Sequence, residues 1–263
     1  MDLQLKGKIA LITGASRGLG FATALQLARE GAQLAINSRS AEKLEIAAES
    51  IRQQTGATVM AVPGDVALPE TASLLIYQVV QQFGGLDILI TSAGGPPPGN
   101  FESFDDEAWE KAVNLSFLSQ MRLIRAALPY LRKSSAPSVL TITSTSVKQP
   151  IPNLVFSNSI RAATAGLTKT LSHELGATGI RFNSILPGWT ETERVTDLMK
   201  ARAKASGSSV EEEIAKQAKD IPMGRIGRPE EFANAAAFLV SPAASYINGV
   251  LLPVDGGALK GTF

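Results

Sequence analysis

The 263-residue sequence contains no cysteine, only one histidine and no long apolar run. Without cysteine, the chain has no disulfide framework, no thiolate metal ligand and no cysteine nucleophile. No apolar run approaches the roughly 20 residues that a membrane helix needs. The first seven residues also lack the pattern of a signal peptide. We therefore expect a soluble protein of the reducing cytoplasm.

An excess of charge of one sign is also absent. The formal net charge is +1, and no block of basic residues occurs. The sequence therefore gives no indication of a nucleic-acid partner or of binding to an anionic membrane surface. At this length, the 44% hydrophobic content is enough to form a large core in one α/β domain. We expect a small-molecule substrate and no metal.

Apolar, β-branched runs alternate with segments of helical periodicity. The expected strands are residues 9–13, 34–37, 58–63, 88–92, 138–143, 181–186 and 249–254. The expected helices are about residues 18–30, 41–55, 70–83, 105–133, 157–178 and 229–240. Continuous apolar strands that alternate with helices are typical of a parallel sheet covered on both faces. We predict an α/β fold: a single Rossmann-type, doubly wound parallel sheet of about seven strands over residues 1–263.

A glycine-rich turn follows the first expected strand. Its pattern is Gly14-x-x-x-Gly18-x-Gly20, and a helical pattern begins at Phe21. Glycine lets the backbone approach a ligand closely, and the free N–H groups and dipole of a helix N-terminus favour an anion. A strand before the turn and a helix after it are the context in which such a turn binds the pyrophosphate of a dinucleotide.

Residues 190–227 interrupt the alternation with a mostly polar segment. Within it, residues 209–218 have the pattern of a short charged helix. Long insertions at the carboxyl edge of a parallel sheet often cover active sites. We expect a substrate lid here, and a solvated surface excursion is the alternative.

Several motifs occur together in the order found in one enzyme family. They are Thr13-Gly14-x-x-x-Gly18-x-Gly20, Asp65-Val66, Thr91-Ser92-Ala93-Gly94, Asn114, Ser144, Pro187-Gly188 with Thr192, and Asp255-Gly256-Gly257. Over essentially the whole chain, this set resembles the short-chain dehydrogenase/reductase family, and in particular its 3-oxoacyl-ACP reductase-like members. The resemblance implies a dinucleotide cofactor, a carbonyl/alcohol reaction and a homodimer or homotetramer.

The resemblance also implies which residues form the site. Those expected to bind the cofactor are Gly14, Ser16, Arg17, Gly18, Leu19, Gly20, Ser38, Arg39, Asp65, Val66, Ala93, Gly94, Pro187, Gly188 and Thr192. Those expected in the catalytic site are Asn114, Ser144, Ser157 and Arg161.

The charge at the end of the second expected strand favours one form of the cofactor. An NAD-type site places a carboxylate there to hold the ribose 2′-hydroxyl. This chain has Ser38 followed by Arg39, and Arg17 adds a second cation within the glycine turn. Two guanidinium groups without a carboxylate suit a 2′-phosphate. We expect NADP(H); the alternative is that both arginines are ordinary solvated charges.

The sequence departs from the family at its proton donor. The family places Tyr-x-x-x-Lys thirteen residues after the catalytic serine, where this chain has Ser157 and Arg161. A serine hydroxyl is shorter than a phenol and a much weaker acid. Arginine stays charged and cannot transfer protons. Arg161 can still hold the ribose hydroxyls and stabilise a developing alkoxide, and its i,i+4 spacing from Ser157 places both on one helix face.

No other residue clearly replaces the missing acid. Tyr77, Tyr130 and Tyr246 lie in or beside outer elements, and His173 is sixteen residues beyond Ser157, about 24 Å along a helix. Lys148 is a further candidate. Two mechanisms stay open: a water held by the serines and Arg161 relays the proton, or the substrate brings its own acidic group.

We therefore hold two hypotheses. One is an NADP(H)-dependent oxidoreductase that interconverts a carbonyl and an alcohol at an atypical site, for which Asn114 and Ser144 argue. The other is a catalytically silent NADP(H)-binding sensor or partner subunit, for which the absent tyrosine and lysine argue. A nucleoside-dependent methyltransferase fits the C-terminal Asp255-Gly256-Gly257 motif poorly.

Overall fold

A single parallel sheet forms the centre of the molecule. The computed structural model describes residues 1–262. The sheet has seven strands in the order β3-β2-β1-β4-β5-β6-β7, and every neighbouring pair is parallel. The strands are β1 (Ile9–Thr13), β2 (Gln33–Ser38), β3 (Val59–Pro63), β4 (Ile88–Thr91), β5 (Ser138–Ile142), β6 (Arg181–Pro187) and β7 (Leu251–Val254). The predicted Rossmann-type sheet is confirmed.

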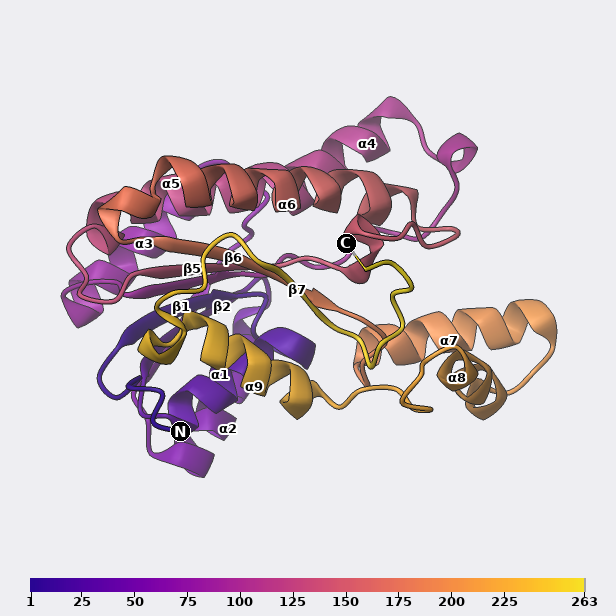
Figure 1. Ribbon diagram of the computed structural model, residues 1–263, viewed down its shortest axis with the longest axis horizontal. Coiled ribbons are helices and arrows are strands. Elements are labelled where there is room, and N and C mark those ends of the chain that lie inside the picture. The colour runs from indigo at the N-terminus through magenta and orange to yellow at the C-terminus, as the bar shows by residue number, and fades with distance from the viewer. Residues whose placement is uncertain (263) are drawn as a thin grey trace.

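Helices cover both faces of this sheet (Figure 1). One layer contains α1 (Gly18–Arg29), α2 (Ala41–Thr55) and α9 (Pro229–Val240). The other contains α3 (Thr71–Phe83), α5 (Ser119–Leu131) and α6 (Val155–Glu174), and α4 (Asp106–Val113) extends from it. Two further helices, α7 (Glu193–Ser206) and α8 (Val210–Lys219), project from one end of the molecule.

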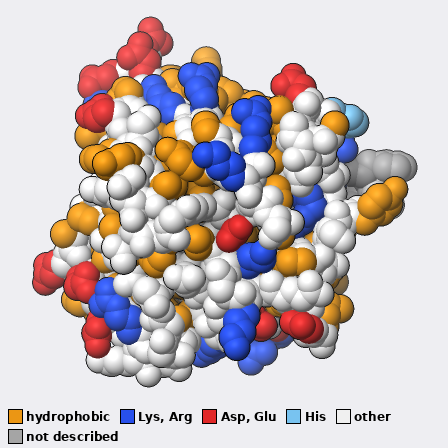
Figure 2. Space-filling model, turned by 90° about the vertical axis from the view of Figure 1, so that its left-hand side faces the viewer, with side chains coloured by type: hydrophobic (Ala, Val, Ile, Leu, Met, Phe, Trp, Pro, Cys, Tyr) orange, Lys and Arg blue, Asp and Glu red, His pale blue; other side chains and the backbone are white. Residues whose placement is uncertain are grey.

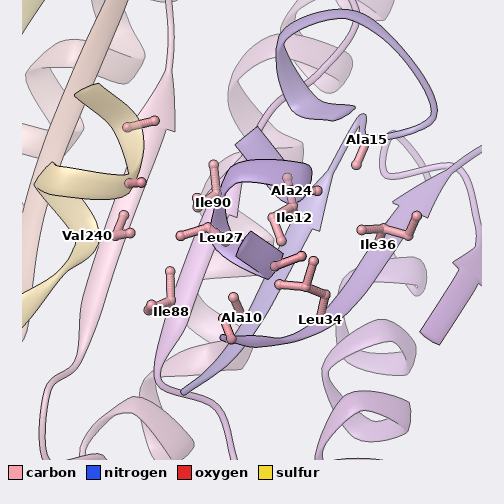
Figure 3. Packing of buried hydrophobic residues seen from close by; sticks show 14 of the residues in the cluster. Ala10, Ile12, Ala15, Ala24, Leu27, Leu34, Ile36, Ile88, Ile90 and Val240 are labelled. Carbon is pink, nitrogen blue, oxygen red and sulfur yellow. The ribbon is translucent and has the colours of Figure 1, made fainter. Parts of the chain in front are cut away.

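The strands are apolar along their length because helices bury both of their faces. On one face, Ala10 and Ile12 of β1 lie beside Leu34 and Ile36 of β2 and pack against α1 (Figure 3). On the other face, Leu11 of β1 belongs to a second buried cluster with α3 and α5. Successive side chains of β1 thus point into two different cores. The strand therefore has no polar residue before Thr13.

The structure corrects two of the predicted helical segments. The expected helix at 105–133 is three pieces, because a π-helical turn at Asn114–Leu118 separates α4 from α5. The polar segment 190–227 holds two helices rather than one. The predicted helix at 209–218 corresponds to α8, whose N-terminus has a capping box between Ser209 and Glu212. The helix α7 was not predicted, because only Met199 and Ala203 of its residues are buried.

Arg181 at the start of β6 ties the sheet to the end of α9. Its guanidinium donates to the carbonyl oxygens of Leu239 (2.7 Å), Val240 (3.1 Å) and Ser241 (3.0 Å), and burial lowers its pKa to about 10. These carbonyls carry the negative end of the α9 dipole, so they stabilise the buried cation.

We predict that Arg181→Lys lowers the free energy of unfolding by about 1–3 kcal/mol, because one ammonium group cannot reach all of these acceptors. Urea denaturation measures the change, with Arg132→Lys as an exposed control. Equal stability of the two variants would show that the buried hydrogen bonds contribute little.

The side of the molecule opposite to α7 and α8 carries basic and acidic side chains dispersed among neutral and apolar atoms (Figure 2). In the described part of the chain, no helix is both long and apolar enough to cross a membrane.

Candidate active site

The ends of β1 and β4 are joined by a threonine side chain. Thr13 Oγ1 donates to the backbone oxygen of Ser92 and accepts from its backbone N–H, each at 2.9 Å. Gly14 follows directly, with φ at +64°, and a Cβ on it would lie 2.7 Å from the Ser92 oxygen. Only glycine fits between these two chain segments, so the first glycine of the motif sets how closely β1 and β4 approach.

The turn after Gly14 leads tightly into α1. A Cβ on Gly20 would overlap the backbone oxygen of Gly14, so Gly20 is required for the turn to close. The N-cap residue of α1 is Arg17, whose side chain caps none of the first N–H groups of the helix. The N-terminus of α1 is therefore left open to an anion, which is the arrangement that a pyrophosphate needs.

The start of α7 closes over this turn. The Arg17 guanidinium forms an ion pair with the Glu193 carboxylate. A methyl group of Thr192 lies 3.7 Å from the position that a Cβ on Gly18 would take. Thr192 also caps α7 by accepting from the Val195 N–H. The structure thus brings two predicted cofactor residues together, Gly18 and Thr192, although they are far apart in the sequence.

Residues expected at the adenosine end lie along the carboxyl ends of β2 and β3. Ser38 ends β2 and Arg39 follows it on the surface. Asp65, just after β3, accepts from the N–H of Ala67 (3.0 Å), and Val66 is buried in the core cluster beside α3. The nearby Asn37 amide donates to the carbonyl oxygens of Val62 (2.9 Å) and Gly64 (3.1 Å), which fixes the two strand ends relative to each other.

Residues expected at the nicotinamide end follow β4 and β6. Ala93 is buried and Gly94 is exposed just past β4. Pro187 ends β6 opposite Val254, and a Cβ on Gly188 would lie 2.6 Å from Asp255 Cβ. Gly188 therefore lets the segment after β6 pass close to the C-terminal motif. Ser16 and Leu19 lie in the glycine turn and in the first turn of α1, each partly buried.

A network of serine hydroxyls follows β5. Ser144 begins a 3₁₀ turn, η3 (Thr145–Val147), by accepting from the N–H of Ser146 at 3.1 Å. The Ser146 hydroxyl in turn lies 3.1 Å from the Ser157 hydroxyl at the start of α6. Ser157 thus hydrogen-bonds Ser146 rather than Ser144. Ser146 joins the two predicted catalytic serines and is a functional candidate that the sequence analysis missed.

Arg161 lies one helical turn after Ser157 and is 8% exposed. Its Nη1 donates to the backbone oxygens of Ile142 (3.2 Å) and Thr143 (2.8 Å), at the carboxyl end of β5. Burial, and to a smaller extent the positive charge of Arg194, lower its pKa to about 10. The guanidinium therefore stays protonated at neutral pH, and the site keeps a fixed positive charge.

Asn114 occupies the first position of the π-helical turn. Its amide nitrogen donates to the Glu110 oxygen (3.2 Å), and its amide oxygen accepts from Arg122 (3.3 Å). It makes no hydrogen bond to Ser144 or Ser157 in the described chain. A π-helical turn inside a helix is frequently found at functional sites.

The other candidate proton donors lie elsewhere. Tyr77 and Tyr246 are exposed, Tyr130 lies near the end of α5, and His173 is exposed near the end of α6. Lys148 directly follows η3 and is exposed. Within residues 1–262, no three His, Asp or Glu side chains gather to hold a metal ion.

Arg194 is the second functional candidate that the sequence analysis missed. It belongs to α7 and donates to the backbone oxygens of Gly95 (3.3 Å) and Pro96 (3.1 Å), which follow β4. The only sequence signal was a cation two residues after Thr192 in a segment expected to cover the site.

The chain is similar to a known family and to solved structures over most of its length. The family model described as enoyl-(acyl carrier protein) reductase matches residues 14–258. The chain belongs to the short-chain dehydrogenase/reductase family. One similar member of this oxidoreductase family is the 3-oxoacyl-[acyl-carrier-protein] reductase of Staphylococcus aureus. It is 32% identical over 97% of its own length and 95% of this chain.

Two solved oxidoreductase structures are similar over nearly the whole chain. L-sorbose reductase from Gluconobacter frateurii, complexed with NADPH and L-sorbose, has a TM-score of 0.95 and 34% identity, and the match covers 99% of this chain and 100% of that one. An NADPH-bound oxidoreductase from Pseudomonas aeruginosa PAO1, described as containing an atypical catalytic center, has a TM-score of 0.88 and 30% identity. That match covers 97% and 98% of the two chains.

Proposed function

We propose that this chain is an NADP(H)-dependent oxidoreductase that interconverts a carbonyl and an alcohol at an atypical site. The observation that carries the proposal is the polar cluster at the end of β5. There, Ser157 hydrogen-bonds Ser146, and the buried Arg161 guanidinium lies one helical turn further along α6. A protein that only binds a nucleotide has no need of this cluster. The substrate is a carbonyl compound, and 3-oxoacyl compounds are the first class to test.

The residues of the glycine turn fit the cofactor. Neither Gly14 nor Gly20 has room for a Cβ, and the N-cap residue of α1, Arg17, makes no side-chain cap in the described chain. Arg17 and Arg39 are the cations that suit a 2′-phosphate, and Ser38 stands where an NAD site has a carboxylate. When bound, the nicotinamide ring supplies or accepts a hydride.

The chain's own residues must then position the substrate and move a proton. We propose that Ser144 and Ser157 hold the substrate oxygen or a water beside it, while Asn114 holds a further water. Arg161 supplies the fixed positive charge that stabilises negative charge on the substrate. Since no side chain here matches a phenol of tuned acidity, the proton comes through water, at a rate lower by about 10²–10⁴ than with a general acid.

The second candidate is a catalytically silent NADP(H)-binding sensor or partner subunit. It is favoured by one observation, that neither Ser157 nor Arg161 can act as an acid near neutral pH. Both candidates require the same cofactor site, so they differ only in turnover.

The deciding experiment is titration with NADPH and, separately, NADH, followed through protein-sensitised fluorescence, and then NADPH oxidation on a panel of carbonyl compounds. Tight NADPH binding with slow oxidation supports the reductase. Tight binding without turnover on any carbonyl supports the sensor. Failure to bind either nucleotide would overturn both candidates.

The Arg17–Glu193 ion pair provides a further prediction about NADPH. Arg17 has to leave Glu193 before it can bind a 2′-phosphate, so the carboxylate competes with the cofactor. Because the two side chains are 62% and 63% exposed, the pair is weak. We expect Glu193→Gln to tighten NADPH binding by about 2- to 5-fold at low ionic strength.

Fluorescence titration measures this change, and Glu191→Gln, an exposed neighbour, is the control. Weaker NADPH binding by the Glu193 variant would show that the ion pair belongs to the closed, cofactor-bound state.

We also propose a homodimer or homotetramer. The outer face of α6 exposes the small residues Ala162, Ala163 and Gly166, which permit close approach of a second helix. Light scattering coupled to size exclusion tests the mass in solution.

A further inference from the structure

The Arg161 guanidinium has hydrogen-bonding capacity that the protein does not use. Guanidinium carries five N–H donors, and the bonds to Ile142 and Thr143 both come from Nη1. Nε and Nη2 donate to no other atom of the described chain. Neither atom is among the fully buried, unpartnered side-chain atoms of the described residues, which are the hydroxyls of Ser116 and Ser138, so both keep a small exposed area. This part of Arg161 is available to a ligand.

Arg194 reaches the same edge of the sheet from α7. Its guanidinium donates to Gly95 and Pro96, just past the end of β4, and lies against Gly95 so closely that a Cβ there would overlap it. The carbonyls that hold Arg161 lie at the end of β5, and β4 and β5 are neighbours in the sheet. One guanidinium is therefore held at the end of β5 from the core, and the other is held from α7 at the loop that follows the neighbouring strand β4.

These two cations lack a counter-ion. Within the described residues, neither forms an ion pair with a carboxylate, and the acidic neighbour Glu193 is paired with Arg17 instead. Arg194 lies close enough that its charge lowers the pKa of Arg161. A buried cation with a second cation nearby is costly unless an anion joins them, and guanidinium groups bind a carboxylate with paired hydrogen bonds.

We propose that Arg161 and Arg194 together bind a carboxylate of the substrate, so that the substrate pair is an oxo acid and the corresponding hydroxy acid. This inference rests on the proposed function. Because Ser157 is one turn from Arg161 on α6, a carbonyl one or two carbons from the bound carboxylate lies on the side of the serine hydroxyls. Its reduction takes up the hydride that NADPH supplies and one proton from water, and yields the hydroxy acid and NADP⁺.

A carboxylate bound by both arginines would also stabilise α7 in its closed position. The anion would join Arg161 of the core to Arg194 of α7, so that the substrate itself would hold the segment over the site. A neutral carbonyl compound lacks this link, and the acid is favoured over its ester.

The test compares short 2-oxo and 3-oxo acids with their methyl esters. NADPH oxidation gives kcat/KM for each, and calorimetry gives the affinity of each for the NADP⁺ complex even where turnover is slow. We expect the native chain to prefer the acid by at least about 10-fold, as one charge-assisted contact implies. Arg194→Met should reduce that preference to near unity in both measurements. Lys204→Met, also exposed on α7, should retain it.

Three outcomes would overturn the inference. In the first, the native chain binds and reduces the esters as well as the acids, so the proposed reductase stands and only the carboxylate site fails. In the second, the Arg194 variant keeps the preference for acids. In the third, this variant loses NADPH affinity in parallel, which would assign Arg194 to the cofactor. Failure of the native chain to bind NADPH would refute the proposed function itself, and is seen before any acid is added.

Discussion

The double substitution Ser157→Tyr with Arg161→Lys is expected to raise carbonyl reduction by about 10²-fold or more, since a positioned general acid contributes about 10²–10⁴-fold. The Ser157 side chain points to the η3 turn, as its 3.1 Å contact with Ser146 shows. A phenol at this position would extend toward the same turn that holds Ser144. A lysine at 161, one helical turn away, would lower the pKa of the phenol through its charge.

The measurement is kcat with NADPH on the carbonyl that the native chain reduces fastest. Ser157→Phe with Arg161→Lys is the matched control, because it has the same ring and the same ammonium group without the hydroxyl. A gain for tyrosine and none for phenylalanine would identify proton donation as the missing step. An equal gain in both variants would instead indicate that volume or the change at 161 is responsible.

The pH dependence separates the same alternatives. A phenol that acts as the acid is active while protonated, so reduction by the tyrosine variant should fall as the pH rises through the pKa of the phenol. The native chain has no such group at 157, and the pKa of Arg161 is about 10. The rate of the native chain should therefore stay level between neutral pH and about pH 10, where the rate of the tyrosine variant falls.

The sheet could be predicted because buried parallel strands leave a direct signal in the sequence. The strand Ile9–Thr13 was predicted at the residues where it occurs, since both of its faces are covered and the run is apolar until Thr13. The glycine turn could be predicted equally well, because Gly14 and Gly20 are required by backbone contacts and not by packing alone. These features depend on residues close together in the chain.

The arrangement of the site could not be read in this way. Arg194 reaches Gly95 across 99 positions of sequence, and the contact depends on where α7 closes. The pairing of Ser146 with Ser157 depends on the η3 turn, which no periodicity marks. The π-helical turn at Asn114 interrupts a helix whose apolar pattern runs on through it. The roles of the site residues themselves stay predictions.

The second large effect that we predict concerns the preference for NADPH over NADH. We expect Arg17→Ala combined with Arg39→Ala to weaken NADPH binding by about 10²–10⁴-fold, since each charge-assisted contact to the 2′-phosphate contributes about 1.5–3 kcal/mol. NADH has no 2′-phosphate, so its affinity should change far less. Ser38 provides no carboxylate to replace the lost contacts, and the variant should bind both nucleotides weakly rather than switch to a tight NAD site.

Fluorescence titration with both nucleotides gives the ratio of their affinities, which is more informative than either value alone. Arg29→Ala, on the last turn of the same helix α1, is the control for a general loss of positive charge. High salt should weaken NADPH binding in the native chain more than in the double variant, because the native contacts are ionic and exposed. If NADH affinity falls in parallel with that of NADPH, the arginines maintain the glycine turn itself, and the specificity for the 2′-phosphate must come from other residues.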